Sequence, residues 1–289
     1  MAKRTRRRRR RRHPLRTLLL LFLLILAGAV FFHWSNHSLQ IEEFTATFEH
    51  LPEGFDGCTI VHLSDLHGAQ FGEDNAQLLD AVRSAQPDYI FLTGDLLDRL
   101  HETPHSYAVQ LCASLTEIAP TYFVTGNHEW ALPNTRQLKV AITQTGSIVL
   151  SNEFVTLERN GDKIILAGVD DPNGFADQKT PDELANELYA AYEDPFWLLL
   201  AHRSNHFAKQ YHLLGAELVI CGHAHGGMIR LPFTDGLIGV ERELFPDYTA
   251  GFYEIDGAQL FVSRGLGNSG PSFRLFNRPQ VAVLTLKRG

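Results

Sequence analysis

The chain has 289 residues, of which 44% are hydrophobic, and it carries a formal net charge of −7. That length allows one large domain with a substantial core or two small ones, and we expect one. Ten of the 26 basic residues precede the first acid, Glu42, which leaves 16 basic residues against 33 acidic ones and a charge of about −17. Nucleic acid is therefore not an expected partner, because its phosphates would be repelled.

The first 34 residues have the features of a membrane anchor. Residues 1–16 form a basic tail, and residues 17–34 form an apolar segment that ends in His33-Trp34. Basic residues before an apolar run predict a transmembrane helix whose N-terminus stays in the cytoplasm. A cleaved signal peptide is the alternative, because 15 uninterrupted apolar residues are few for a span and Ala27-Gly28-Ala29 fits a cleavage pattern. Both interpretations export the rest of the chain.

Strand-like and helix-like patterns alternate after the anchor. Apolar and polar residues alternate from Gln40 to Glu49, which is typical of an edge strand, and a core strand starts near Cys58. Helices are expected at about 75–85, 106–115, 136–145 and 181–192, and strands at 147–150, 154–157 and 164–168. Asn160-Gly161 predicts a hairpin between the last two strands. These patterns predict one α/β domain over residues 40–289, with mixed sheets that contain parallel βαβ units.

The last third of the chain reads as strands. We expect them at 251–255, 259–262 and 281–286, with Asp256-Gly257 as a hairpin turn, and we expect all three to complete a second sheet. The three cysteines, Cys58, Cys112 and Cys221, lie in apolar contexts without zinc-type or redox spacing. They are expected to be buried free thiols.

Five apolar runs of strand length end in residues that can bind a metal. These residues are Asp65 and His67, Asp95, Asn127 with His128, His202, and His223 with His225. Oxygen and imidazole ligands suit divalent ions such as Mn, Fe and Zn, and open α/β sheets place their chemistry at the carboxyl ends of strands. Each residue alone could be a helix cap or a turn residue, but the repetition predicts a metal site. His62 lies inside a strand and is interpreted as a core residue.

The ordered motifs Asp-x-His, Gly-Asp, Gly-Asn-His-Glu, a strand-terminal His and Gly-His-x-His resemble the calcineurin-like metallophosphoesterase superfamily over residues 58–227. Residues 263–269 and Arg278-Pro279 resemble its bacterial membrane-anchored branch. The resemblance implies a two-sheet αββα sandwich. It also implies a hydrolase that uses two divalent metal ions and a metal-bridging hydroxide to cleave phosphoester or pyrophosphate bonds.

The resemblance also assigns roles to residues. It implies that Asp65, His67 and His225 hold one ion, that Asn127, His202 and His223 hold the other, and that Asp95 bridges both. His128 would be catalytic, stabilising the transition state or protonating the leaving oxygen. The chain departs from the pattern at Arg203, where a proline is frequent, and at Met228, where a glutamine is common. The candidate substrate-binding residues are Arg203, Arg230 and Arg264, with solvated or salt-bridged arginines as the alternative.

The expected partners are the membrane and a phosphorylated, lipid-linked small molecule. The positive-inside rule places the domain on the exterior side of a bacterial inner membrane, and the short link after Trp34 holds it near the headgroups. Hydrolysis of UDP-2,3-diacylglucosamine in lipid A synthesis is one alternative, although that substrate lies on the cytoplasmic leaflet. The others are a soluble phosphodiester or nucleotide substrate, a binding protein with a decayed site, and a metallo-amidase, for which a mononuclear zinc set is expected.

Overall fold

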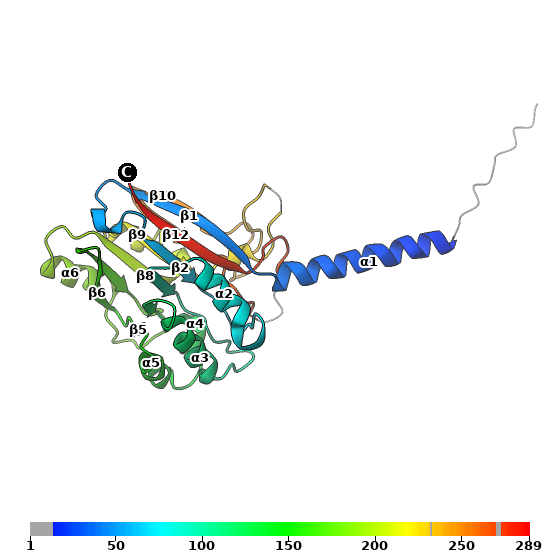
Figure 1. The fold of residues 1–289 in the computed structure, drawn as a ribbon, viewed down its shortest axis with the longest axis horizontal. Helices are drawn as coiled ribbons and strands as arrows, with labels where there is room; N and C mark the ends of the chain where they lie inside the picture. The colour runs from blue at the N-terminus through cyan, green and yellow to red at the C-terminus, as the bar shows by residue number, and fades with distance from the viewer. Residues whose placement is uncertain (1–13, 232, 270–272) are drawn as a thin grey trace, which may run out of the picture.

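A computed structural model of the chain describes residues 14–231, 233–269 and 273–289. Its first element is helix α1 (Pro14–His37), which projects from one end of the domain (Figure 1). The helix contains the expected anchor and runs three residues further at each end, so at 24 residues it is about 36 Å long. It is long and apolar enough to cross a membrane, and an 18-residue stretch of it has a mean hydropathy of 2.5. Residues 1–13 of the basic tail lie outside the described residues.

The first sheet contains six strands in the order β1-β12-β2-β3-β4-β5. Their bounds are β1 (Gln40–Phe48), β12 (Gln280–Arg288), β2 (Thr59–Leu63), β3 (Tyr89–Leu92), β4 (Thr121–Phe123) and β5 (Ile148–Val149). The expected edge strand is confirmed as β1. The placement of β12 in the second sheet was wrong, because it lies between β1 and β2, parallel to the first and antiparallel to the second. Its first five residues are all buried, which requires a neighbouring strand on each side and cover on both faces.

The second sheet has the order β10-β11-β9-β8-β7-β6. Its strands are β10 (Gly251–Ile255), β11 (Ala258–Val262), β9 (Leu218–Gly222), β8 (Trp197–Arg203), β7 (Asp162–Gly168) and β6 (Glu153–Arg159). Both expected hairpins, β6–β7 and β10–β11, are confirmed as antiparallel pairs. Asn160 and Gly161 have φ values of 51° and 90°, as the tight turn between β6 and β7 requires. The strands between the hairpins pair in parallel.

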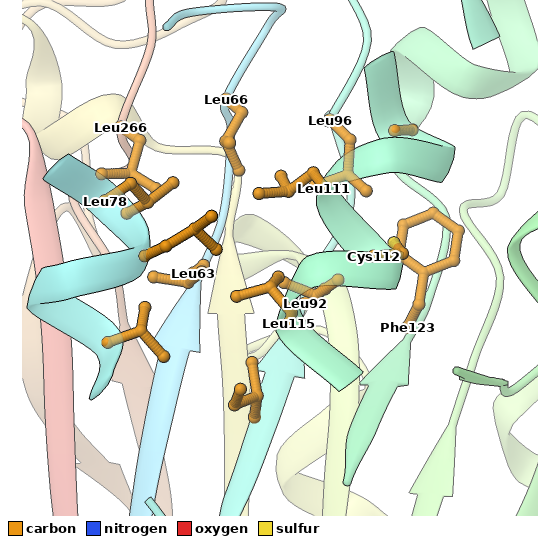
Figure 2. Packing of buried hydrophobic residues seen from close by; sticks show 14 of the residues in the cluster. Leu63, Leu66, Leu78, Leu92, Leu96, Leu111, Cys112, Leu115, Phe123 and Leu266 are labelled. Atoms are coloured by element: carbon orange, nitrogen blue, oxygen red, sulfur yellow. The ribbon is translucent and has the colours of Figure 1, made fainter. Parts of the chain in front are cut away.

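Helices cover the outer faces of the two sheets. On the first sheet lie α2 (Ala76–Ser84), α3 (His105–Thr116) and α5 (Thr135–Thr143), and α6 (Pro181–Ala191) packs on the second. Leu111, Cys112 and Leu115 of α3 contact side chains from β3 and β4 (Figure 2). A separate core fills the space between the sheets. The result is the expected mixed α/β sandwich of two sheets between helices, and all three cysteines are buried free thiols.

The core between the sheets should dominate stability. Leu284 of β12 is fully buried there, whereas Leu213 is 71% exposed. Leu284→Ala should lower the free energy of unfolding by about 2–5 kcal/mol, because it leaves a cavity between two rigid sheets. Leu213→Ala should change it by less than about 0.5 kcal/mol. Denaturant unfolding of the full chain in detergent measures both, and equal effects would contradict the assignment of this core.

Candidate metal centre

Both sheets deliver polar side chains to the same edge. In the first sheet the parallel strands β2, β3 and β4 lead into Asp65 with His67, Asp95 and Asn127. In the second sheet the parallel strands β8 and β9 carry or lead into His202, His223 and His225. The structure therefore brings together all seven residues that the sequence singled out as metal ligands. Three groups of these buried residues, one of which also includes His128, have ligand atoms within 4.8 Å of one another.

One half of the cluster centres on His67. Its Nε2 atom lies 3.1 Å from Nε2 of His225 and 3.7 Å from Oδ2 of Asp95. Nε2 of His225 lies 3.6 Å from Oδ1 of Asp65. Burial lowers the pKa of His67 to about 4 and that of His225 to about 3. Both imidazoles are therefore neutral near pH 7, and each offers a lone pair to a metal.

The other half of the cluster centres on His202. Nδ1 of His202 lies 2.7 Å from the carbonyl oxygen of Thr93, so it carries the proton and Nε2 presents a lone pair. This Nε2 lies 3.0 Å from Oδ1 of Asn127, 3.0 Å from Nδ1 of His223 and 3.3 Å from Oδ2 of Asp95. Acceptor atoms this close repel one another unless a positive charge lies between them.

The raised pKa of His202 shows that the surrounding carboxylates favour a positive charge at this point. Burial lowers its pKa, yet the carboxylate of Asp95, together with those of Asp65 and Asp171, outweighs burial and raises the pKa to about 10. A divalent cation satisfies the same acceptors without protonating the imidazole. The donor set of carboxylate, amide and imidazole fits ions such as Mn, Fe and Zn. Asp95 lies within reach of both halves of the cluster and can therefore serve two ions.

The backbone is strained where these ligands sit. Five of them adopt left-handed φ values between 47° and 71°: Asp65, His67, Asp95, His223 and His225. Such conformations persist only where the surrounding structure enforces them. Glu129 of the short helix α4 (Asn127–Ala131) contributes, because its carboxylate accepts backbone N–H bonds from Asp95, Leu97 and Gly126. This residue fastens the loop after β3 to the loop after β4.

Asp98 is a residue of the site that the sequence reasoning missed. It is fully buried, and its Oδ1 lies 3.1 Å from Nδ1 of His128. The backbone N–H of Arg99 donates to the same Nδ1 at 3.2 Å, which orients the ring. Nε2 of His128 lies 3.4 Å from Oγ of Ser269 at the pocket. In the sequence, Asp98 could have been recognised as a second carboxylate three residues after Asp95. It does not lie directly at the end of a strand, which is the pattern that identified the other candidates.

A pocket of about 510 Å³ opens beside the ligands. It is lined by ligand residues, by the cationic residues Arg99, Arg203 and Arg242, and by apolar residues that include Met228, Ile238, Val240 and Phe273. A pocket that combines convergent polar groups with apolar walls is typical of a binding site for an organic ligand.

The three candidate substrate-binding arginines differ in position. Arg203 lines the pocket, and its Nε and Nη2 donate to the two carboxylate oxygens of Asp171 at 2.7 and 3.1 Å. Arg230 donates to the carbonyl oxygen of Gly226, and Arg264 forms an ion pair with Glu42 at 2.7 Å. Neither of these two lines the pocket.

His62 is a core residue, as the sequence indicated. Its Nε2 lies 2.7 Å from Oγ1 of Thr93, and burial lowers its pKa to about 3. It belongs to none of the metal-binding groups found among the described residues.

The sequence profile of the calcineurin-like phosphoesterase family matches residues 58–227. The chain belongs to this family. An uncharacterized metallophosphoesterase of Bacillus subtilis, YkuE, is 31% identical to it and covers 87% of this chain and 86% of its own. An uncharacterized metallophosphoesterase of Aquifex aeolicus is 30% identical, and the alignment covers 88% of this chain and 94% of that protein. A Danio rerio protein named as a transmembrane protein with a metallophosphoesterase domain is 28% identical. The alignment covers 83% of this chain and 55% of that protein.

Family membership and geometry agree on the chemistry. This calcineurin-like phosphoesterase is a metalloenzyme that hydrolyses phosphoesters, and its His and Asp groups are arranged for two metal ions. The family profile ends at residue 227, so it includes the ligand-bearing strands but stops just before most of the apolar residues of the pocket.

Asp95 should be the residue on which both metal positions depend. Asp95→Asn should reduce metal content at both, because it removes the charge that the two halves of the cluster share. The measurement is metal content by mass spectrometry after dialysis, with the exposed Asp235→Asn as control. Loss of only half of the metal would contradict a shared ligand.

Proposed function

We propose that this enzyme hydrolyses a phosphoester or pyrophosphate bond in a lipid-linked substrate at the surface of the membrane that holds α1. The observation that carries the proposal is the composition of the pocket. Four of the candidate metal ligands, three arginines and Glu241 line it together with apolar residues that include Met228, Ile238, Val240 and Phe273. An amphiphile with a phosphorylated headgroup has the matching chemistry.

Seven residues would hold the metals. Asp65, His67 and His225 serve one ion, Asn127, His202 and His223 serve the other, and Asp95 serves both. When bound, two divalent ions neutralise phosphoryl oxygens and generate a nucleophile from water near neutral pH. The chain itself supplies the orientation, because hydrogen bonds to the backbone hold the ligands. Nδ1 of His202 donates to Thr93, and the carboxylate of Asp65 accepts the N–H of His223 at 3.0–3.1 Å.

His128 and Arg203 act on the substrate in this proposal. The backbone N–H of His128 donates to Oδ1 of Asp95 at 2.8 Å, and the backbone N–H of Arg99 donates to Nδ1 of the His128 ring at 3.2 Å, so Nε2 faces the pocket. There it stabilises developing charge or protonates the leaving oxygen. Arg203 is held by Asp171 in a fixed orientation, and it presents a cation to the anionic headgroup. Arg230 and Arg264 have no role in the proposed site, since neither of them lines the pocket.

The proposed location of the catalytic domain follows from the distribution of Lys and Arg residues around the apolar run. Ten Lys and Arg residues precede the apolar run, and none occurs between Arg16 and Arg83. This asymmetry favours a cytoplasmic N-terminus and a catalytic domain on the exterior side of a bacterial inner membrane. The Danio rerio relative is also named as a transmembrane protein, which supports an anchored enzyme.

His128 is expected to serve the chemistry and not the binding of metal. His128→Ala should lower kcat by about 10²–10⁴ and leave metal content nearly unchanged, because a positioned acid or charge stabiliser contributes in that range. The exposed His50→Ala serves as control. Activity on a chromogenic phosphodiester and metal analysis give both readouts, and an empty site in the variant would refute this division of roles.

The lipid part of the proposal predicts a dependence on acyl chains. The value of kcat/KM for a diacylated phospho-substrate in micelles should exceed that for its deacylated headgroup, because the apolar walls bind only the former. Steady-state kinetics with both compounds makes the comparison. Equal values would remove the lipid hypothesis and favour a soluble phosphoester.

A further inference from the structure

The segment from Ile229 to Ala250, between the last metal-ligand turn and β10, exposes large apolar side chains. Phe233 is fully exposed, and Leu244 and Phe245 are 72% and 73% exposed. Exposed apolar side chains of this size on one segment mark an interaction surface. We call these three residues the apolar rim.

The apolar rim borders the pocket. Leu244 forms a β-bridge with Ile238, and the N–H of Phe245 donates to the carbonyl oxygen of Leu237 at 3.0 Å. Ile238 and Val240 line the pocket itself. The outward side chains of Leu244 and Phe245 therefore stand beside its apolar wall, and that wall and this part of the rim form one structural unit.

The same unit is joined to the anchor. The N–H of Arg230 donates to the carbonyl oxygen of Leu275 at 3.0 Å, and the residues flanking Leu275 contact α1. Phe276 lies 4.9 Å from Phe31 between ring centroids, and Phe273 lies 6.1 Å from Phe32. Phe273 also lines the pocket, so one side chain belongs to the catalytic cavity and to the surface of α1.

A pair of hydrogen bonds fixes the direction of the anchor. Oδ1 of Asn36 accepts the N–H of Arg274 at 2.8 Å, and Nδ2 donates to the carbonyl oxygen of the same residue at 2.9 Å. Ser35 and Asn36 are buried, so the last turn of α1 is part of the domain and not a loose linker. In Figure 1 the yellow to orange segment lies at the end of the domain from which α1 leaves.

We propose that the apolar rim docks into the interfacial layer of the bilayer that holds α1, so that the pocket opens at the lipid surface. This inference rests on the membrane anchoring in the proposed function and does not depend on which phosphoester is cleaved. The occupant is lipid because the rim is continuous with the apolar anchor through residues 273–276. Burial of aromatic and aliphatic side chains at the headgroup boundary drives the docking.

The charges of the segment from Ile229 to Ala250 indicate which kind of lipid surface the apolar rim fits. Glu241 and Glu243 flank Arg242 immediately before Leu244, and all three are exposed. Two carboxylates against one guanidinium disfavour a strongly anionic surface. The apolar rim therefore fits a zwitterionic headgroup layer, where apolar burial and not charge provides the attraction.

Site-directed spin labelling of the full chain in phosphatidylcholine vesicles tests the docking. The native cysteines are buried, so a nitroxide reports on an introduced cysteine at Phe233→Cys or Phe245→Cys. Val140→Cys, on α5, is the exposed control away from the anchor, and Leu21→Cys reports on α1. Labels at 233, 245 and 21 should collide more with oxygen than with an aqueous nickel complex, and the label at 140 should show the reverse.

The outcomes separate the two proposals. The docking would be overturned if the labels at 233 and 245 were as accessible to the nickel complex as the label at 140 while the label at 21 lay in lipid. The proposed anchor would remain intact in that case. A water-exposed label at 21 would overturn the anchoring and the docking with it. Lipid-like accessibility at 233 and 245 supports the docking whichever substrate the enzyme proves to hydrolyse.

Discussion

The convergence of acceptor atoms around Asp95 is the constraint on which the rest of the structure depends. Buried imidazole nitrogens and carboxylate oxygens lie 3.0–3.7 Å apart, and a cation must balance them. The two sheets meet at their carboxyl edges, so both supply ligands to the same point. The left-handed backbone at five ligands, and the three backbone N–H bonds that Glu129 accepts, keep the loops in this arrangement.

The metal centre is also joined to helix α1 by a continuous set of polar contacts. Asn36 at the end of α1 binds the backbone of Arg274, and the guanidinium of Arg274 donates to the carbonyl oxygens of Arg264 and Gly267. Three residues further along, Nδ2 of Asn277 donates to the carbonyl oxygen of His225 at 2.7 Å. The position of a candidate metal-binding residue thus depends on a loop that α1 holds. A fragment beginning after His37 lacks Asn36, so it retains the ligands but loses the contact that fixes this loop.

Arg203 illustrates how the structure gives a location to a charge whose setting the sequence left open. In the sequence it could have been a solvated arginine, a surface ion pair or a substrate contact. The structure places it in the pocket with both oxygens of Asp171 as partners, which raises the pKa of Arg203 further against the effect of burial. A guanidinium held in this way loses little side-chain entropy when it binds an anion.

The sequence by itself determined the features that depend on neighbours along the chain. Turn chemistry placed both hairpins, apolar periodicity placed the main helices, and the seven candidate ligands could be singled out because each lies in or soon after a buried strand. Tertiary structure alone decided what depends on distant pairing. The insertion of β12 between β1 and β2, the contact of Asp98 with His128, and the junction of Phe273 with α1 join segments whose partners no local pattern specifies. The physical reason is that periodicity and turn geometry act over a few residues, whereas strand order and side-chain contacts are selected by the packing of the whole domain.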